Sequence, residues 1–509
     1  MRRTTLMEIK NFTQIKTLGE LKHSGYRSRS IKEELRANLI SKIKNNEKIF
    51  AGIIGYDHSV IPDLQRAILA KHNITLLGLR GQAKSRIARQ MIELLDEYIP
   101  TIEGAELNDD PLSPLSRFAK DLIAERRDET PIRWMHRSER YTEKLATPDV
   151  SVADLVGDVD PIKAASLKLP YSDERVIHFG LLPRSHRCIF VINELPDLQA
   201  RIQVALFNIL QEGDIQIRGF KIRLPLDIQF VFTANPEDYT NRGAIVTPLK
   251  DRIESQILTH YPKTLATSKS ITAQEANIPA DSIARIHVHD LVKNLIEQIS
   301  FEARESQYID PKSGVSARLS ISAYENLRST AERRMLLNKE NNTFVRISDL
   351  AGVVPAITGK IELVYEGEQE GSAKVAHILI GKAIRTQFPN YFPNPEKMKK
   401  KQESSPYQKV VNWFGDGNTI DLLTEYSQTE YEKKLSSIPG LKDLVKKYHP
   451  NADRVTLFLL MEFTLFGLAE YSFLSKYQLE KGIQFKDLLT SMLTMTEGDE
   501  EEGGFDTFR

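Results

Sequence analysis

The chain has 509 residues, 41% of them apolar, and equal numbers of basic and acidic side chains, 69 of each. This length allows two to four domains, and the balanced charge gives no global sign of binding to nucleic acid or to an anionic membrane. The single cysteine, Cys188, excludes an intrachain disulfide and a cysteine-rich metal site. It fits a reducing cytosol, so we expect a cytoplasmic protein.

The first part of the chain leads up to one buried strand. Residues 1–45 form a basic leader with helical periodicity, and a short segment and a helical pattern over 60–69 follow it. The apolar run 74–77 then predicts a short buried strand.

The turn after this strand has the composition of a phosphate-binding loop. Its residues expected to bind nucleotide are Gly78, Gly81, Gln82, Ala83, Lys84 and Ser85, and a helical pattern follows them. Backbone N–H groups of such a turn point at phosphates. The Lys84 ammonium would reach the β and γ phosphates, and the Ser85 hydroxyl would hold Mg²⁺. Ala83 stands where the common form of the loop has Gly, so an ordinary strand–turn–helix is the alternative interpretation.

A second buried strand, 187–194, ends in the polar pair Asn193 and Glu194. About ninety residues separate it from the loop's helix, which predicts insertions. In phosphate-loop ATPases an acidic pair stands at this place: the first carboxylate orients Mg²⁺, and the second activates the attacking water. Glu194 fills the second position, whereas Asn193 occupies the first. A strand end with ordinary polar residues is the alternative.

Further along, a hairpin with its turn at Gly219 and a third buried strand, 228–233, are predicted. Asn235 follows that strand, and an amide there could position water or a γ-phosphate. Arg252 and Arg318 are single arginines, a residue type that is usually solvated at the surface, and only their place in the motif order singles them out. The most apolar segment, 455–469, is too short to cross a membrane, and we interpret it as a buried helix.

This order of motifs resembles an AAA+ ATPase. Two segments resemble the magnesium chelatase I subunit: residues 179–187, similar to its F-x-G-L-L-x-x-A-H/N-R-G segment, and residues 154–160, similar to its L-x-G-x-x-D insert. The loop 78–85 is closer to the G-x-P-G-x-A-K-S/T loop of the related MoxR ATPases. The resemblance covers about residues 48–365.

The resemblance implies an assembly and a set of roles. The assembly is a ring, usually a hexamer, with ATP between subunits and a von Willebrand A-domain partner on a separate chain. The implied roles follow the motif order: Lys84 and Ser85 bind the phosphates and Mg²⁺, Glu194 activates water, Asn235 is sensor 1, Arg252 is the finger that reaches the neighbour's γ-phosphate, and Arg318 is sensor 2.

The expected fold class is α/β, an AAA+ P-loop core with a parallel sheet, followed by a helical lid and a helical C-terminal domain. The expected divisions are a leader (1–45), the nucleotide-binding domain (46–265), the lid (266–365), a linker (366–406), the C-terminal domain (407–495) and an acidic tail (496–509).

The expected function is that of a chaperone-like remodelling ATPase of the MoxR or magnesium chelatase I type. Because Asn193 lacks the usual negative charge, we expect slow hydrolysis with a weak hold on Mg²⁺, unless a nearby carboxylate such as Asp197 replaces that charge. Two alternatives stay open: an ATP-gated scaffold with little hydrolysis, and the motor subunit of a true metal chelatase. Neither a membrane nor a nucleic acid is expected as a partner.

Overall fold

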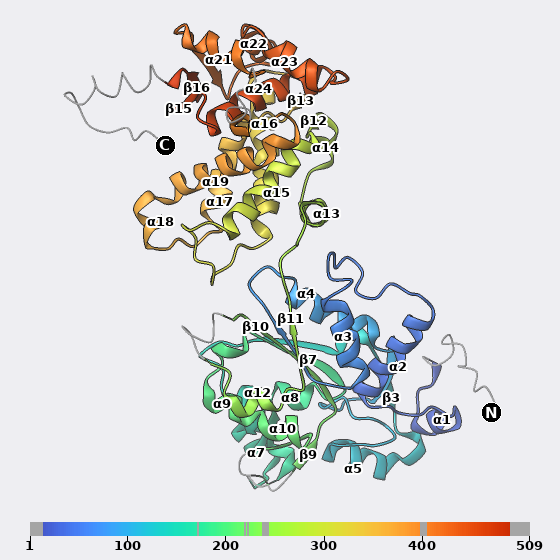
Figure 1. Ribbon diagram of the computed structural model, residues 1–509. Coiled ribbons are helices and arrows are strands. Elements are labelled where there is room, and N and C mark those ends of the chain that lie inside the picture. Colours follow the sequence, from blue (N-terminus) through green and yellow to red (C-terminus); the bar gives the residue numbers. More distant parts are fainter. Residues whose placement is uncertain are drawn as a thin grey trace. The chain divides into compact units, whose positions relative to one another are not determined.

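The computed structural model describes residues 14–170, 173–217, 220, 223–236, 244–397 and 405–488. The chain divides into two compact units, residues 1–260 and 261–509 (Figure 1). The predicted turn at Gly219 and the predicted acidic tail lie outside the described residues, as does the start of the leader.

A five-stranded parallel sheet forms the centre of the first unit. Across the sheet the strands run in the order β11-β1-β10-β7-β4, and every neighbouring pair is parallel. Numbered by chain position, this order is 5-1-4-3-2. The strands are β1 (Ile74–Leu77), β4 (Tyr141–Leu145), β7 (Cys188–Asn193), β10 (Ile228–Ala234) and β11 (Ser255–Leu258). The three strands predicted from apolar runs are therefore confirmed, and all five carboxyl ends lie at one edge.

Helices cover both faces of this sheet, because successive side chains of a buried strand point to opposite faces. On β7, Ile189 and Val191 pack against the cluster that holds α2, α3 and α4, whereas Phe190 and Ile192 pack against the cluster of α6 to α12. The helices of the unit are α1 (Leu18–His23), α2 (Ile31–Lys44), α3 (Val60–Leu69), α4 (Lys84–Gln90), α5 (Arg117–Arg126), α6 (Val152–Leu155), α7 (Pro161–Leu167), α8 (Leu181–Arg184), α9 (Ala200–Ala205), α10 (Phe207–Gln211) and α12 (Thr247–Asp251).

The described residues of the first unit also form three antiparallel strand pairs: β2 (Tyr98–Ile102) with β3 (Ile132–His136), β5 (Gly157–Val159) with β6 (Ile177–Phe179), and β8 (Asp214–Gln216) with β9 (Arg223–Pro225). The β8–β9 pair is the predicted hairpin, and the other two lie in the predicted insertions. The leader's helix α2 is fixed to the sheet by a buried ion pair in which Arg140 Nη1 lies 2.6 Å from Glu34 Oε1.

The second unit is mainly helical. Its helices are α13 (Leu265–Glu275), α14 (Ala280–Arg285), α15 (Asp290–Arg304), α16 (Arg318–Leu337), α17 (Val354–Thr358), α18 (Tyr365–Glu370), α19 (Ser372–Gln387), α21 (Gln408–Gly415), α22 (Gln428–Ser436), α23 (Leu441–Tyr448) and α24 (Arg454–Glu470). It also has a short parallel pair, β12 (Ile286–His287) with β13 (Thr343–Phe344), and an antiparallel sheet of β14 (Ile420–Leu423), β16 (Gly482–Lys486) and β15 (Ser475–Leu479).

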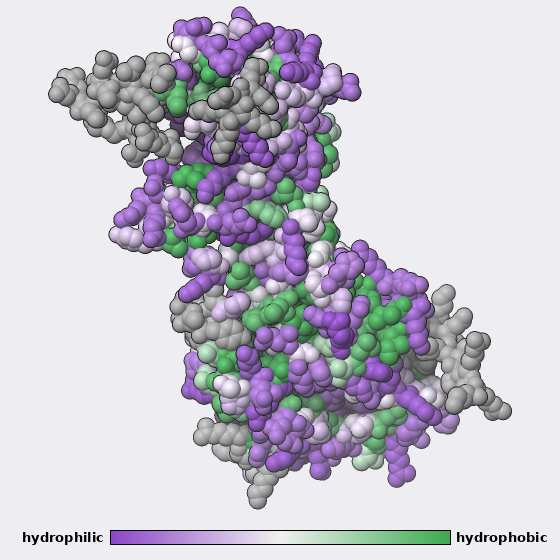
Figure 2. Space-filling model, in the orientation of Figure 1, coloured by the Kyte–Doolittle hydropathy of each residue, from purple (hydrophilic) through white to green (hydrophobic). Residues whose placement is uncertain are grey.

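One hydrophobic core runs through the second unit, from Ile286 to Phe485. Residues of the predicted lid and of the predicted C-terminal domain both contribute to it, and the division between them stays a prediction. The predicted buried helix is α24, whose apolar residues from Leu457 to Leu468 fill the core. Within the described ranges, no helix is long and apolar enough to cross a membrane. Hydrophilic side chains cover most of the face of the second unit that Figure 2 shows.

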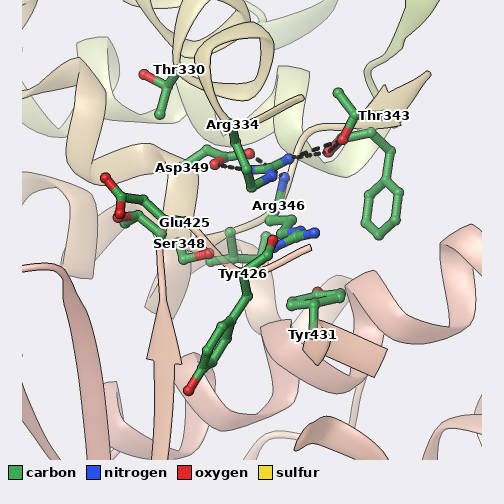
Figure 3. A network of polar contacts seen from close by, with 12 residues as sticks. Thr330, Arg334, Thr343, Arg346, Ser348, Asp349, Glu425, Tyr426 and Tyr431 are labelled. Atoms are coloured by element: carbon green, nitrogen blue, oxygen red, sulfur yellow. Dashed lines mark hydrogen bonds and ion pairs between the residues drawn. The ribbon is translucent and has the colours of Figure 1, made fainter. Parts of the chain in front are cut away.

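A buried polar network joins the two parts of this core (Figure 3). On α16, Arg334 forms an ion pair with Asp349 and donates to the carbonyl of Phe344 at 2.7 Å. Arg346 lies 4.1 Å from the centre of the Tyr431 ring and donates to the carbonyl of Tyr426 at 2.8 Å.

Glu462 of α24 extends the same network across the core. It accepts hydrogen bonds from the N–H groups of Ile347 at 2.7 Å and Ser348 at 3.0 Å. Burial, the largest effect, raises the pKa of Glu462, although these N–H donors oppose the shift. The network thus ties α16 and the turn after it to the C-terminal helices.

We predict that Asp349→Asn destabilises the second unit by about 3–5 kcal/mol, because it leaves the buried Arg334 guanidinium without its counter-charge. Denaturant unfolding of the purified chain measures this. The matched control is Asp290→Asn, which removes an exposed pair with Lys269 and should cost about 1 kcal/mol or less. Equal effects of the two changes would contradict the role given to the network.

Candidate functional site

The loop after β1 has the backbone of a tight glycine turn. A side chain at Gly78 would collide with the side chains of Thr259 and Gln82, so only glycine fits there. Gly81 has φ +73° and Ala83 has φ +59°, both in the left-handed region. Ala83 is the residue that precedes helix α4, which begins at Lys84. The unusual alanine therefore occupies a conformation in which a Cβ costs roughly 1–2 kcal/mol.

Gln82 supports the loop through its buried side chain. Its side chain is buried, and its Oε1 accepts a hydrogen bond from Thr259 Oγ1 at 2.6 Å, directly after β11. The Tyr56 hydroxyl hydrogen-bonds to the carbonyls of Gln82, at 3.1 Å, and His260, at 2.7 Å. These contacts give the Gln82 side chain a supporting position in the loop.

Lys84 connects the loop to the end of β10. Its ammonium donates to Asn235 Oδ1 at 2.7 Å and to the carbonyl of Leu79 at 2.9 Å, and it also contacts the carbonyl of Gly78. Two residues that lie 151 positions apart in sequence thus meet at the carboxyl edge of the sheet. Parallel pairing of β1 with β10 produces this meeting, because it places Leu77 opposite Ala234.

Ser85 and Asn193 also meet at this edge. Ser85 Oγ donates to Asn193 Oδ1 at 3.4 Å, and Thr233 Oγ1 donates to the same oxygen at 3.0 Å. The Thr233 hydroxyl in turn accepts the backbone N–H of Glu194 at 3.1 Å. Glu194 has φ +55°, a left-handed backbone that is costly for a residue with a side chain. Thr233, which the sequence analysis did not select, therefore holds both members of the polar pair.

Glu143, on the edge strand β4, is a second residue at this site that the sequence patterns did not indicate. Its Oε1 accepts a hydrogen bond from Asn193 Nδ2, and its Oε2 lies 2.9 Å from Nε of Arg89 on α4. Burial is the largest single effect on this carboxyl and opposes its ionisation. Hydrogen bonds from Arg89 and Asn193 nevertheless hold the pKa of Glu143 below its ordinary value. The carboxylate that contacts Asn193 thus comes from the neighbouring strand.

The two arginines selected from the motif order belong to different units. Arg252 precedes β11, whose first residue, Ser255, pairs with the first residue of β1, so it lies toward the opposite edge of the sheet from the loop. It packs 4.8 Å from the Phe207 ring centre and donates to Gln211 Oε1 at 3.0 Å. Arg318 is an exposed residue at the start of α16 and belongs to the second unit. The first unit alone therefore brings neither arginine to the loop.

The oxygen donors at this edge suit a hard cation. The Ser85 hydroxyl, the Asn193 carbonyl oxygen and the Glu143 carboxylate are the ligand types that Mg²⁺ prefers. No group of three or more His, Cys, Asp or Glu side chains that could hold a metal by themselves occurs in the described parts of the chain. A cation here would therefore share its coordination with phosphates and water, as in phosphate-loop enzymes.

Strand order 5-1-4-3-2, a glycine loop between the central strand and a helix, and polar residues at the ends of β7 and β10 together define the class: an AAA+ ATPase core of the P-loop α/β fold. No family model matches the chain. Within this class, the motifs at residues 78–85, 154–160 and 179–187 resemble those of the MoxR and magnesium chelatase I group.

Several solved structures are similar to this chain. A chain from the complex of the magnesium chelatase subunits BchI and BchD is 20% identical, with 63% of this chain and 98% of that chain covered and a TM-score of 0.33. A Cytophaga hutchinsonii protein assigned as an ATPase is 16% identical, with 71% and 97% covered and a TM-score of 0.27. A variant of RuvB from Thermotoga maritima is 12% identical, with 60% and 71% covered and a TM-score of 0.34.

We predict that Ala83→Gly stabilises the first unit by about 1 kcal/mol, because glycine adopts the left-handed backbone of this position without strain. Thermal unfolding measures this as a higher Tm. In the matched control, Ala88→Gly, the glycine enters the right-handed helix α4 and should destabilise by about 1 kcal/mol. A lower Tm for both variants would show that position 83 is not strained.

Proposed function

We propose that the chain binds and hydrolyses ATP, and the observation that carries this is the meeting of Lys84 with Asn235 and of Ser85 with Asn193 at one edge of the sheet. A lysine, two amides and a serine hydroxyl are brought there from three strand ends. The loop N–H groups at the start of α4 add donors for phosphate oxygens. Lys84 would bind the β and γ phosphates as a point charge.

The remaining residues have roles in hydrolysis. Glu194 would accept the proton of the attacking water, and Thr233 keeps its backbone in position through the hydrogen bond to its N–H. Asn235 would orient that water or the γ-phosphate. Ser85 and Asn193 would hold Mg²⁺, whose positive charge, when bound, would offset the negative charge of the phosphates.

We further propose a ring in which Arg252 acts on the neighbour's nucleotide. Within its own chain Arg252 lies away from the loop, so its charge could reach a γ-phosphate only across a subunit contact. Its contacts with Phe207 and Gln211 would hold the guanidinium in a fixed orientation for that purpose. Arg318 would act as sensor 2.

In this proposal the ring is a chaperone-like machine that remodels a client, with a von Willebrand A-domain protein as its partner. The motifs at residues 154–160 and 179–187 favour this group. Experiment can distinguish this function from two alternatives. An ATP-gated scaffold would bind ATP without turnover, and the motor of a metal chelatase would act on a porphyrin together with partner subunits.

Lys84→Ala is expected to abolish ATP binding, because it removes the positive charge that faces the phosphates. Equilibrium titration with a fluorescent ATP analogue in excess Mg²⁺ measures binding, and phosphate release measures turnover. Lys71→Ala, which removes an exposed lysine paired with Glu33, is the matched control and should bind as the wild type does. Wild-type affinity in Lys84→Ala would overturn the assignment of the loop.

Arg252→Ala is expected to keep ATP binding and to lose about 10³-fold in turnover, as for other arginine fingers. Glu194→Gln should lose turnover as well. Mixing the two inactive chains should restore part of the rate, because some interfaces then combine an intact Glu194 with an intact Arg252. Full activity of a strictly monomeric protein, or no recovery in a mixture that co-assembles, would argue against action across subunits.

A further inference from the structure

The contacts of Asn193 determine which way its amide faces. Oδ1 receives the hydroxyls of Ser85 and Thr233, and Nδ2 donates to the carboxylate of Glu143. An ionised carboxylate can only accept hydrogen bonds, whereas hydroxyls can donate or accept. The amide nitrogen must therefore face Glu143, and the carbonyl oxygen must face Ser85. Asn193 in this way presents an acceptor oxygen toward the serine that would hold the metal.

This arrangement divides the two properties of an aspartate between two residues. An aspartate at the end of β7 would supply an acceptor oxygen and a negative charge. Asn193 supplies the oxygen, and Glu143 supplies the charge one hydrogen bond further away, from the adjacent strand. The register makes them diagonal neighbours on one face of the sheet, because Glu143 pairs with Val191, two residues before Asn193.

Arg89 limits how much of that charge acts at the site. It forms two hydrogen bonds with Glu143, from Nε at 2.9 Å and from Nη2 at 3.3 Å. The Arg89 side chain is 63% exposed, so solvent screens its positive charge, whereas the Glu143 side chain is only 20% exposed. The buried side of the ion pair, which faces Asn193, is therefore the negative one.

We propose that Glu143 and Asn193 together replace the metal-orienting aspartate, with Glu143 as a positioning residue that sets the hold of the site on Mg²⁺. This inference rests on the proposed ATP binding. It also reverses what the motif alone would predict for Asn193→Asp, the change that restores the usual aspartate. In Asn193→Asp, two carboxylates would lie in direct contact, and their repulsion would move one of them out of the site. Exchange of the two groups, in the double variant Asn193→Asp with Glu143→Gln, keeps one carboxylate and one amide in hydrogen-bond contact.

The test is the Mg²⁺ concentration needed for half-maximal binding of a fluorescent ATP analogue to the full chain, with binding in EDTA measured alongside. Glu143→Gln should raise that concentration by ~10–100-fold, the usual effect of losing a partner of a metal ligand, and leave binding in EDTA unchanged. Asn193→Asp alone should also raise it, and the double variant should return it toward the wild-type value. Glu139→Gln, which removes an exposed glutamate paired with Arg133, is the matched control and should have no effect.

Arg89→Gln changes an exposed side chain, so the variant should fold as the wild type does. Freed from its cation, Glu143 should act more strongly, so the Mg²⁺ requirement should fall, opposite in sign to the effect of Glu143→Gln. A purely structural role of the Arg89–Glu143 pair would move both variants in the same direction and would overturn the inference, as would a double variant no better than Glu143→Gln. These results differ from a failure of the proposed function, in which the wild type and Lys84→Ala would be indistinguishable in ATP binding.

Discussion

The parallel pairing of β1, β10 and β7 is the constraint on which the candidate site depends. Strands β7 and β10 each contribute one or two polar residues just beyond the last apolar position, β1 leads into the loop that ends at Lys84, and parallel alignment brings these residues to one edge. A register shift by one residue would exchange the side chains of a strand that face the two apolar clusters and so disrupt their packing. Burial of β7 and β10 thus determines where Asn193, Glu194 and Asn235 lie, although none of these three contributes to the hydrophobic core.

The part of the site that lies on buried strands could be predicted from the sequence. Apolar runs mark β1, β7 and β10, and the residues that follow them are easily read as site residues. Strand β4 has no such run, because its residues Tyr141 to Leu145 are polar or partly exposed. An edge strand buries only part of its surface and so carries a weak pattern. Glu143 was missed for this reason, and only the spatial order of the strands shows that it lies beside Asn193.

In the second unit, the sequence could indicate where the helices lie along the chain but not how they pack against one another. The pattern of 455–469 correctly predicts a buried helix, but Glu462 within it gives no sign of its partners, two of which, Ile347 and Ser348, lie more than 100 residues away. Buried ionic groups are costly unless all of them are satisfied. A chain that ended near residue 385 would lose α24 and leave these groups, and the core around them, without partners. The C-terminal helices therefore contribute to the stability of the helical unit.

The two departures from the common phosphate-loop pattern differ in kind. Ala83 affects only its own backbone: the left-handed conformation is kept, and the chain tolerates the local strain of a Cβ. Asn193 affects charge, and the loss of a charge can be compensated by another residue, as long as that residue is close and oriented. Glu143 meets both conditions, since it touches the amide and is held by Arg89. The slow, weakly Mg²⁺-dependent hydrolysis expected from Asn193 alone stays a prediction, and the proposed role of Glu143 argues against it. In this proposal the Mg²⁺ requirement is set by the balance between Glu143 and Arg89, and loss of the exposed Arg89 shifts it in the opposite direction to loss of the largely buried Glu143.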